Sequence, residues 1–263
     1  MKSLKKKRFD LFILILLLVL ASLYAFLSQG LFIGKPLIVG CVFTIPSILY
    51  LSIRKKKNWQ KILISTVLFG GIFAFALDFI AEYTHTWNTI NLVFPYKILG
   101  IDPIDNILGY MLMTMLTVVF YEHFIDRKIN HHISKNLPYA IFPGIFAVVA
   151  LIVIYITNPS LLITRYPYLY MGIAAVIPVL FLCFKRPQLI KKLALTAIYF
   201  FFFYFIFEFF AVSYNYWIYT GNNYVGWVSL FDIKYPFEEL FFWMIFYAAS
   251  LVCYYEIFVD DEQ

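Results

Sequence analysis

Eight apolar segments of roughly 20 residues each limit what this chain can fold into. A helix needs about 20 mostly apolar residues to cross the hydrocarbon core of a bilayer. Inside that core only helices and closed barrels satisfy every backbone hydrogen bond. The predicted spans are residues 9–29, 31–53, 61–83, 103–124, 138–158, 166–184, 190–212 and 236–258. We therefore predict an all-α fold, a polytopic membrane helix bundle of about eight transmembrane helices.

The charge pattern predicts topology. The chain has 263 residues, is 63% hydrophobic and 14% charged, and has a net charge of +6. A soluble domain carries about 25% charged residues. The basic residues form short clusters between the spans, so we expect no nucleic-acid partner. The clusters are Lys5–Arg8, Arg54–Lys57, Arg127 with Lys128 and Lys135, and Lys185 and Arg186 with Lys191 and Lys192. Eight helices place all of them on one side, which predicts an integral membrane protein, typical of a prokaryotic cell membrane, with both termini cytoplasmic.

The two halves of the chain match each other at an offset between 130 and 134 residues. "FAFALDFIAEYTHTW" is similar to "FYFIFEFFAVSYNYW", and "DPIDNILGYM" is similar to "KYPFEELFFWM". The aligned pairs are Pro46 and Pro178, Asp78 and Glu208, Trp87 and Trp217, Pro103 and Pro236, Asp105 and Glu238, and Glu122 and Glu256. We predict a tandem 4+4 repeat of parallel units, residues 1–130 and 131–263. The first helix imitates a signal peptide, but its match to the fifth helix predicts that it is retained.

Seven carboxyl groups fall at one predicted depth, in the extracytoplasmic third of the bundle. They are Asp78, Glu82, Asp102, Asp105, Glu208, Glu238 and Glu239. Acids inside a membrane are costly and usually face the bundle interior or a cavity. A cluster with few counter-ions favours protonated carboxyl groups, which can act as proton donors.

The acids that follow Pro103 and Pro236 also have a purely structural explanation. Proline suits the first helical position, and acids there favour the positive end of the helix dipole. Helix capping does not explain the aligned acids Asp78 and Glu208, which lie near the ends of the preceding helices. We therefore interpret the repeated acids as candidates for a functional site.

Aromatic residues make up 21% of the chain. Trp87 and Trp217 follow helix ends, where tryptophan commonly anchors a helix at the membrane interface, although their alignment is also compatible with a pocket wall. The run "YFFFFYFIFEFF" suits either lipid-facing bulk or a cavity whose rings would contact a polyene or a carbocation.

Motifs for nucleotide binding, hydrolysis and metal-dependent proteolysis are missing, including GxGxxG, GxxxxGK[ST], GxSxG and HExxH. The cysteines Cys41, Cys183 and Cys253 are isolated within apolar segments, so neither a disulfide frame nor a zinc site is indicated. We expect no cofactor and no metal.

The segment "PFEELFF", preceded by an acidic helix that ends in a tryptophan, resembles the lycopene cyclase domain of the small integral-membrane type. That type occurs as two-subunit enzymes in bacteria and as fused tandem domains in archaea and fungi. The second half matches its motif at Pro236, Glu238, Glu239, Phe241 and Phe242. The first half, "PIDN", keeps Pro103 and Asp105 but has Asn106 in place of the second acid. The predicted four helices per half also depart from the three expected of the family.

The resemblance implies an isomerase of carotenoid biosynthesis that closes a ring at the end of a linear polyene, without redox chemistry. It implies Glu238 or Glu239 as the acid and Glu208 as the base or an orienting group. Asp78, Glu82 and Asp105 would form the corresponding site of the first half. The substrate contacts would be Pro236, Phe241, Phe242, Trp217 and Trp87. The expected partner is an apolar polyene or isoprenoid in the bilayer, and a homo-oligomer or an assembly with other carotenoid enzymes is compatible with this.

Two other classes of function stay open. The pair in "DFIAE" is compatible with an intramembrane prenyltransferase that uses Mg²⁺ and a diphosphate, although Val212 stands where Glu82 stands in the first half. A carotenoid- or lipid-binding membrane protein, or a transporter built on parallel repeats, is the non-enzymatic alternative.

Overall fold

The structure is a computed structural model of the chain and describes residues 2–54, 57–126, 131–231 and 233–260. Within these residues, eight helical segments are long and apolar enough to cross a membrane. This confirms the all-α, polytopic helix bundle. Lys55, Lys56, Arg127 and Lys128 of the basic clusters lie outside the described residues, as does the predicted end of the first repeat unit at residue 130.

The first half contains three spans, then three short strands, and ends with α5 as its fourth span. Its elements are α1 (Lys2–Leu27), η1 (Phe32–Gly34), α2 (Pro36–Arg54), α3 (Trp59–Ser65), η2 (Thr66–Phe73), α4 (Ala74–Tyr83), β1 (Asn88–Thr89), β2 (Lys97–Ile98), β3 (Asp102–Pro103) and α5 (Ile104–Phe124). The helices α3, η2 and α4 form one continuous span. The segment η2 is a π-helix, in which the turns are wider than in an α-helix.

The second half has the same order of spans. Its elements are α6 (Pro138–Thr157), η3 (Pro159–Leu162), α7 (Pro167–Lys185), α8 (Gln188–Ser213), β4 (Trp217–Ile218), β5 (Trp227–Leu230), β6 (Ile233–Pro236), η4 (Glu239–Phe246) and α9 (Tyr247–Phe258). The π-helix η4 continues into α9 as the last span. The aligned prolines Pro46 and Pro178 lie inside α2 and α7.

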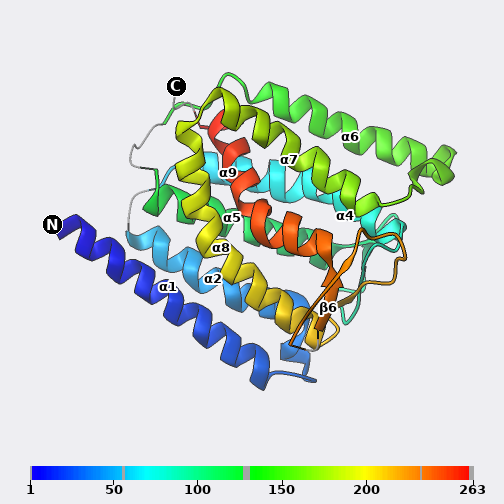
Figure 1. Cartoon of the computed structure of the whole chain (residues 1–263), viewed down its shortest axis with the longest axis horizontal. Coiled ribbons are helices and arrows are strands. Elements are labelled where there is room, and N and C mark those ends of the chain that lie inside the picture. Colours follow the sequence, from blue (N-terminus) through cyan, green and yellow to red (C-terminus); the bar gives the residue numbers. More distant parts are fainter. Residues whose placement is uncertain (1, 55–56, 127–130, 232, 261–263) are drawn as a thin grey trace.

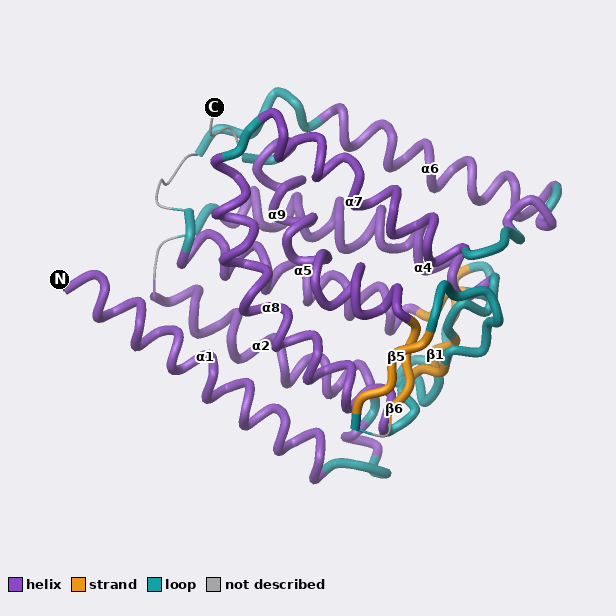
Figure 2. The backbone as a smooth tube through the Cα atoms, viewed as in Figure 1, coloured by secondary structure: helices purple, strands orange, loops and turns teal. Residues whose placement is uncertain are grey.

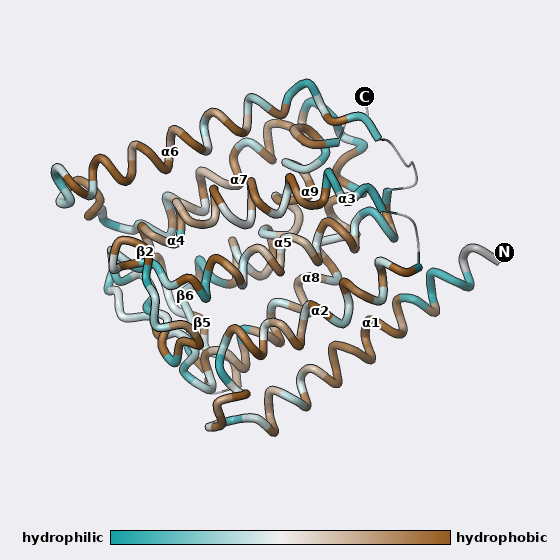
Figure 3. Tube along the Cα trace, turned by 180° about the vertical axis from the view of Figure 1, so that it is seen from behind, coloured by the Kyte–Doolittle hydropathy of each residue, from teal (hydrophilic) through white to brown (hydrophobic). Residues whose placement is uncertain are grey.

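The first helix of each half lies at the periphery of the bundle. Figure 1 shows α1 and α6 at opposite edges, with both chain termini at one end of the molecule. These two spans also have the smallest share of buried residues among the eight. Their exposed side chains are mainly apolar, as a lipid-facing surface requires. Along the bundle the helices are predominantly hydrophobic (Figure 3).

A buried acid fixes the peripheral first helix to the rest of the bundle. Asp10 of α1 is 3% exposed and accepts hydrogen bonds from Tyr50 and Arg54 of α2, both at 2.7 Å. Its second oxygen lies 2.9 Å from Nε2 of His123 on α5. The apolar residues of α1 that face inward, such as Leu14 and Ala21, are buried in the main core. The first helix is therefore an integral part of this fold.

Short strands gather at the end of the bundle opposite the termini (Figure 2). The hairpin β2–β3 precedes α5, and the hairpin β5–β6 precedes η4. Pro103 and Pro236 are the last residues of β3 and β6, and each stands directly before its helix instead of at the first helical position. Both prolines end a strand because they pair in a hairpin, Pro103 with Lys97 and Pro236 with Trp227.

The two halves are joined at both ends of the bundle. At the strand end, β1 pairs antiparallel with β4, with Asn88 opposite Ile218. At the other end the hydrogen bonds are reciprocal: Tyr121 donates to Glu256, and Tyr255 donates to Glu122. The equivalent residues of the two halves therefore contact each other across their interface.

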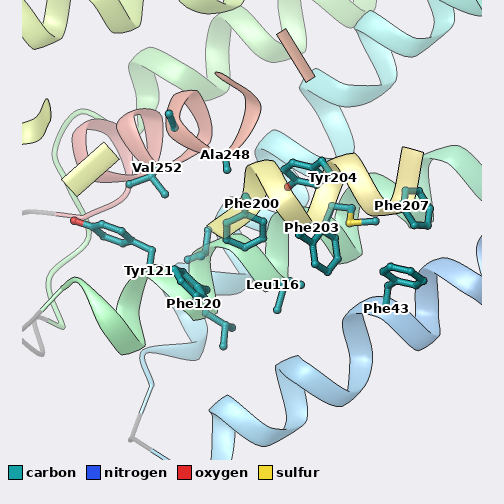
Figure 4. Close-up of a cluster of buried hydrophobic side chains, with 14 of the residues drawn as sticks. Phe43, Leu116, Phe120, Tyr121, Phe200, Phe203, Tyr204, Phe207, Ala248 and Val252 are labelled. Carbon is teal, nitrogen blue, oxygen red and sulfur yellow. The ribbon is translucent and has the colours of Figure 1, made fainter. Parts of the chain in front are cut away.

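The phenylalanine-rich part of α8 forms the centre of the main core. Phe200, Phe203, Tyr204 and Phe207 are buried against α2 and α5 (Figure 4). Phe43 of α2 meets Phe203 and Phe207 edge-to-face, at centroid distances of 5.8 and 5.4 Å. Of the four rings from α8, Phe207 alone lines the cavity described below. The run therefore serves mainly as core packing.

Candidate functional site

A cavity of about 560 Å³ lies between the two halves. Its size is typical of a site for a ligand of tens of heavy atoms, since such pockets span about 300–1,000 Å³. Glu239 lines one end of the cavity, and Phe258, at the far end of α9, lines the other. The cavity therefore extends along most of the thickness of the bundle.

Both π-helices contribute to the wall of this cavity. Phe69 and Phe73 come from η2, whereas Glu239, Phe242 and Trp243 come from η4. Segments of π-helix are rare and occur frequently at functional sites. They also lie at non-equivalent spans of the two halves, the third and the eighth. The cavity is therefore asymmetric although the order of the spans repeats.

Asp78 carries the best-satisfied carboxyl group of the cavity. Its Oδ1 accepts hydrogen bonds from Nε1 of Trp87 at 2.9 Å and from the hydroxyl of Tyr110 at 3.1 Å. Its Oδ2 accepts one from the amide of Asn106 at 2.7 Å. Asp78, Trp87, Asn106 and Tyr110 all line the cavity. The structure therefore brings these four polar side chains together at the end of the cavity nearest the strands.

Glu82 lies one turn further along α4 and holds the loop that follows this helix. Its Oε1 accepts hydrogen bonds from the backbone N–H of Thr89 at 2.8 Å and from Asn106 at 3.2 Å. Glu82 is buried but is not among the described residues that line the cavity. The structure places it behind Asp78, where it can position the site.

The second half repeats the bond between a tryptophan and an acid. Nε1 of Trp217 donates to Oε1 of Glu208 at 3.0 Å, and the hydroxyl of Tyr219 donates to the same oxygen at 2.7 Å. Burial, followed by the carboxyl of Glu208, raises the pKa of the Tyr219 hydroxyl well above its usual range, so this group remains a donor. No described residue donates to the buried Oε2 of Glu208.

Glu239 joins Glu208 at the cavity. The hydroxyl of Tyr168 on α7 donates to Oε2 of Glu239 at 2.6 Å. The carboxyl groups of Glu208 and Glu239 are close enough to interact directly. Of this pair, Glu239 lines the cavity, together with Tyr168 and Tyr219. The site therefore has an acid that a ligand can reach and a second acid beside it.

Asp105 and Glu238 occupy equivalent places and anchor loops. Asp105 accepts hydrogen bonds from the backbone N–H groups of Val93 and Phe94, at 2.6 and 3.1 Å. Glu238 accepts one from the backbone N–H of Val225 at 2.7 Å. In both halves the first acid after the proline thus binds the preceding loop. Asp105 also lines the cavity, whereas Glu238 is not among its described lining residues.

Some of the predicted substrate contacts line the cavity, and the others are not among its described lining residues. Trp87, Trp217 and Phe242 line the cavity. Phe241 stacks instead on Phe237, with a centroid distance of 5.9 Å. Pro236 belongs to β6.

Several cavity residues were missed by reasoning from the sequence alone. Asn106 could have been found, since it is aligned with Glu239 in the repeat. Tyr219 also had a signal, two residues beyond the aligned tryptophan. Tyr168 had none, because it reaches Glu239 only through the packing of α7 against η4. Its ring also meets Trp87 edge-to-face at 5.1 Å, so it connects the acids of the two halves.

The polar end of the cavity thus combines carboxyl groups, hydroxyl donors and aromatic faces. Among the residues that the structure describes, no group of three or more His, Cys, Asp or Glu side chains is arranged to hold a metal ion. Comparison of the chain with protein-family models, curated proteins and solved structures found no match.

Proposed function

We propose that the chain is a membrane-embedded cyclase that closes a ring at the end of a linear polyene by acid–base chemistry. The observation that carries this proposal is the cavity between the halves, which is apolar along most of its length and has carboxyl groups at one end. An apolar chain would lie along the cavity, and its end group would reach the carboxyl groups. The resemblance of "PFEELFF" to the lycopene cyclase domain is the second support.

The proposed reaction is an isomerisation in which atoms and electrons balance. A carboxylic acid gives its proton to a double bond of the end group and leaves a tertiary carbocation. A neighbouring double bond attacks this cation and closes the ring, which moves the positive charge to a ring carbon. A carboxylate then removes a proton from the adjacent carbon, and the electrons of that C–H bond form the ring double bond. No oxidant or reductant is required.

Glu239 is the group that we assign as the acid. It lines the cavity and has a second carboxyl, Glu208, beside it, whereas Glu238 is bonded to a loop. Asp78 is assigned as the base, because it lines the cavity on the first half, whereas Asp105, which also lines it, is bonded to a loop. The rings of Trp243 and Tyr110, which meet edge-to-face at 5.6 Å, both line the cavity and are the aromatic groups that we assign to stabilise the cation.

Expression in a host that accumulates lycopene, followed by chromatography of the pigments, tests this proposal. We expect cyclic carotenes from the wild-type chain and none from Glu239→Gln. Glu122→Gln is the matched control, because this buried glutamate lies at the opposite end of the bundle. Unchanged lycopene with a well-inserted wild-type chain would contradict a lycopene cyclase.

Incubation of membranes that contain the chain with unlabelled lycopene in heavy water tests the mechanism separately from the substrate. Each ring formed by protonation should gain one deuterium from the exchangeable acid, which mass spectrometry would detect as one mass unit per ring. Rings without deuterium would argue against a carboxylic acid as the proton donor.

Binding of a carotenoid or lipid without chemistry is the second candidate, favoured by the largely apolar wall of the cavity. It predicts that the purified protein retains a pigment of unchanged structure. The same expression experiment separates the two functions, because the pigment bound to the protein and the total pigment can be analysed side by side.

A further inference from the structure

The first half lacks the second acid of the motif, because Asn106 stands where the second half has Glu239. Asn106 bonds to Asp78, as Glu239 interacts with Glu208. On this comparison alone, Asp78 would have no equivalent of Glu239 beside it, because the other first-half acid at the cavity, Asp105, is bonded to a loop. A different position supplies the missing partner.

Asp102 precedes Pro103 at the end of the hairpin β2–β3. It is 0% exposed, and no described N–H or hydroxyl group donates to either of its carboxyl oxygens. An ionised carboxylate without donors is very unfavourable in a buried site. In the second half the aligned residue is Tyr235, which is also buried and has no described partner for its hydroxyl. The position before the proline therefore carries a different polar group in each half.

The surroundings of Asp102 favour its neutral form. The strand β3 packs against α4, which places Asp102 beside Asp78 and Glu82. The nearest cation, Lys97 of β2, is exposed. Burial, followed by the neighbouring carboxyl groups of Asp78 and Glu82, raises the pKa of Asp102 to about 11. A neutral carboxylic acid has an O–H group that can donate a hydrogen bond.

We propose that Asp102 is a positioning residue that remains protonated and donates a hydrogen bond to Asp78, so that the two form a carboxyl pair equivalent to Glu208 and Glu239. Each half then presents one member of its pair to the cavity, Asp78 or Glu239, and keeps the other member behind it. The pairs are built from different sequence positions: the residue before the proline in the first half and the third residue after it in the second half.

As part of a reaction, this inference rests on the proposed function, and it specifies where the protons go. Two carboxyl groups side by side in a buried site resist being ionised together. The Glu208–Glu239 pair would fall from two protons to one when it protonates the end group. The Asp78–Asp102 pair would rise from one proton to two when Asp78 removes the proton from the ring carbon. Neither pair then passes through a doubly charged state.

Both pairs are bonded to a tyrosine that lines the cavity. The hydroxyl of Tyr110 donates to Asp78, and the hydroxyl of Tyr168 donates to Glu239. After release of the product, exchange of protons between the pairs and the medium restores the starting state, which is why each ring formed in heavy water should gain one deuterium.

Infrared spectroscopy of the purified full chain, with aspartate labelled by carbon-13 in its side-chain carboxyl, tests the pair without any substrate. We expect a protonated-carboxyl band at neutral pH that shifts with the label in the wild type. Asp102→Asn should remove this band, whereas Asp105→Asn should retain it. In Asp102→Glu a protonated band should persist but lose its sensitivity to the label. Absence of a label-sensitive band in the wild type, or its survival in Asp102→Asn, would overturn the proposal.

Ring formation gives the second readout. Asp102→Asn should reduce ring formation by about tenfold or more. A loss near tenfold would be smaller than the contribution of about 100-fold or more that is usual for a group that transfers the proton itself. Asp102→Glu should restore part of the activity. A tenfold or larger loss with the band retained contradicts a role through the proton of Asp102. If no variant and no wild-type chain forms rings, the cyclase proposal fails, while the infrared result still decides whether Asp102 is protonated beside Asp78.

Discussion

The bonds between the tryptophans and the acids predict unequal costs for two similar substitutions, Trp217→Phe and Trp87→Phe. Each removes one indole N–H that donates to a buried carboxyl group. Trp217 is one of two described donors to Glu208, and none reaches the second oxygen. Trp87 is one of three described donors to the two oxygens of Asp78. We therefore expect Trp217→Phe to be the more destabilising substitution.

The expected magnitude follows from the number of donors left. A hydrogen bond contributes about 0.5–1.5 kcal/mol to stability between neutral groups and about 1.5–3 kcal/mol when the acceptor is charged. We expect Trp217→Phe to lower the free energy of unfolding by about 0.5–3 kcal/mol. For chains near this size, that corresponds to a fall in Tm of roughly 1–12 °C, at about 2–4 °C per kcal/mol. Trp87→Phe should cost less, because two donors remain on Asp78.

Loss of ring packing is nearly matched between the two variants. Trp217 contacts Phe207 at a centroid distance of 5.8 Å, and Trp87 contacts Tyr168 at 5.1 Å. Thermal unfolding in detergent micelles, followed by the loss of monodisperse protein, would measure the difference. A cost for Trp87→Phe that equals or exceeds that for Trp217→Phe would refute the argument from donor number.

Three further predictions concern other parts of the bundle. Gly172→Ala should lower the free energy of unfolding by about 1–3 kcal/mol, because the added methyl would overlap the ring of Phe242, whereas the control Gly109→Ala, whose methyl meets no atom within 4 Å, should not. Lys61→Met should cost about 3–5 kcal/mol in an unfolding assay, because it leaves its buried partner Asp260 unpaired, and the double variant with Asp260→Leu should recover most of this loss. Asp102→Asn should flatten the pH dependence of Tm. Because the pKa of Asp102 is raised in the folded chain, that chain holds one proton more than the unfolded chain between about pH 4 and pH 11, and wild-type stability falls by up to about 1.4 kcal/mol per pH unit as the pH rises through this window. An unchanged slope in the variant would contradict a buried protonated Asp102.

The spans could be predicted from the sequence because hydropathy alone decides which segments enter a bilayer. The predicted span 103–124 is observed as Ile104–Phe124. The last span, predicted as 236–258, is observed as Glu239–Phe258, and it begins later because Pro236 pairs with Trp227 in a hairpin. Hairpins of this kind precede both fourth helices and depend on pairing that no apolar pattern reveals.

The candidate acids were predictable as a group, but their separate roles were not. The repeat placed Asp105 opposite Glu238 without indicating that both bind backbone N–H groups of loops. Tyr168 and the cavity itself depend on how α7 packs against η4, which is a matter of side-chain shape. The pairing of β1 with β4 joins residues 130 positions apart, and the aligned tryptophans hinted at it only indirectly.

The contacts that join the two halves at both ends of the bundle argue against the transporter alternative. Rocking of one repeat against the other would have to break the β1–β4 pairing and the reciprocal bonds of Tyr121 and Tyr255. These contacts between the halves therefore favour a site that does not alternate its access during function.

The π-helix η4 makes the identity of the cavity wall sensitive to the length of a single span. Each residue of an α-helix turns the chain by about 100°. Deletion of one residue from η4 that restored ordinary α-helical bonding would therefore rotate Glu239 and Phe242 by about that angle relative to α9. The shortened segment would still be long enough to cross the bilayer, and its hydropathy would hardly change. Insertions and deletions of one residue are thus a route by which chains of this architecture could exchange one set of wall residues for another, with no change in the number or order of their spans.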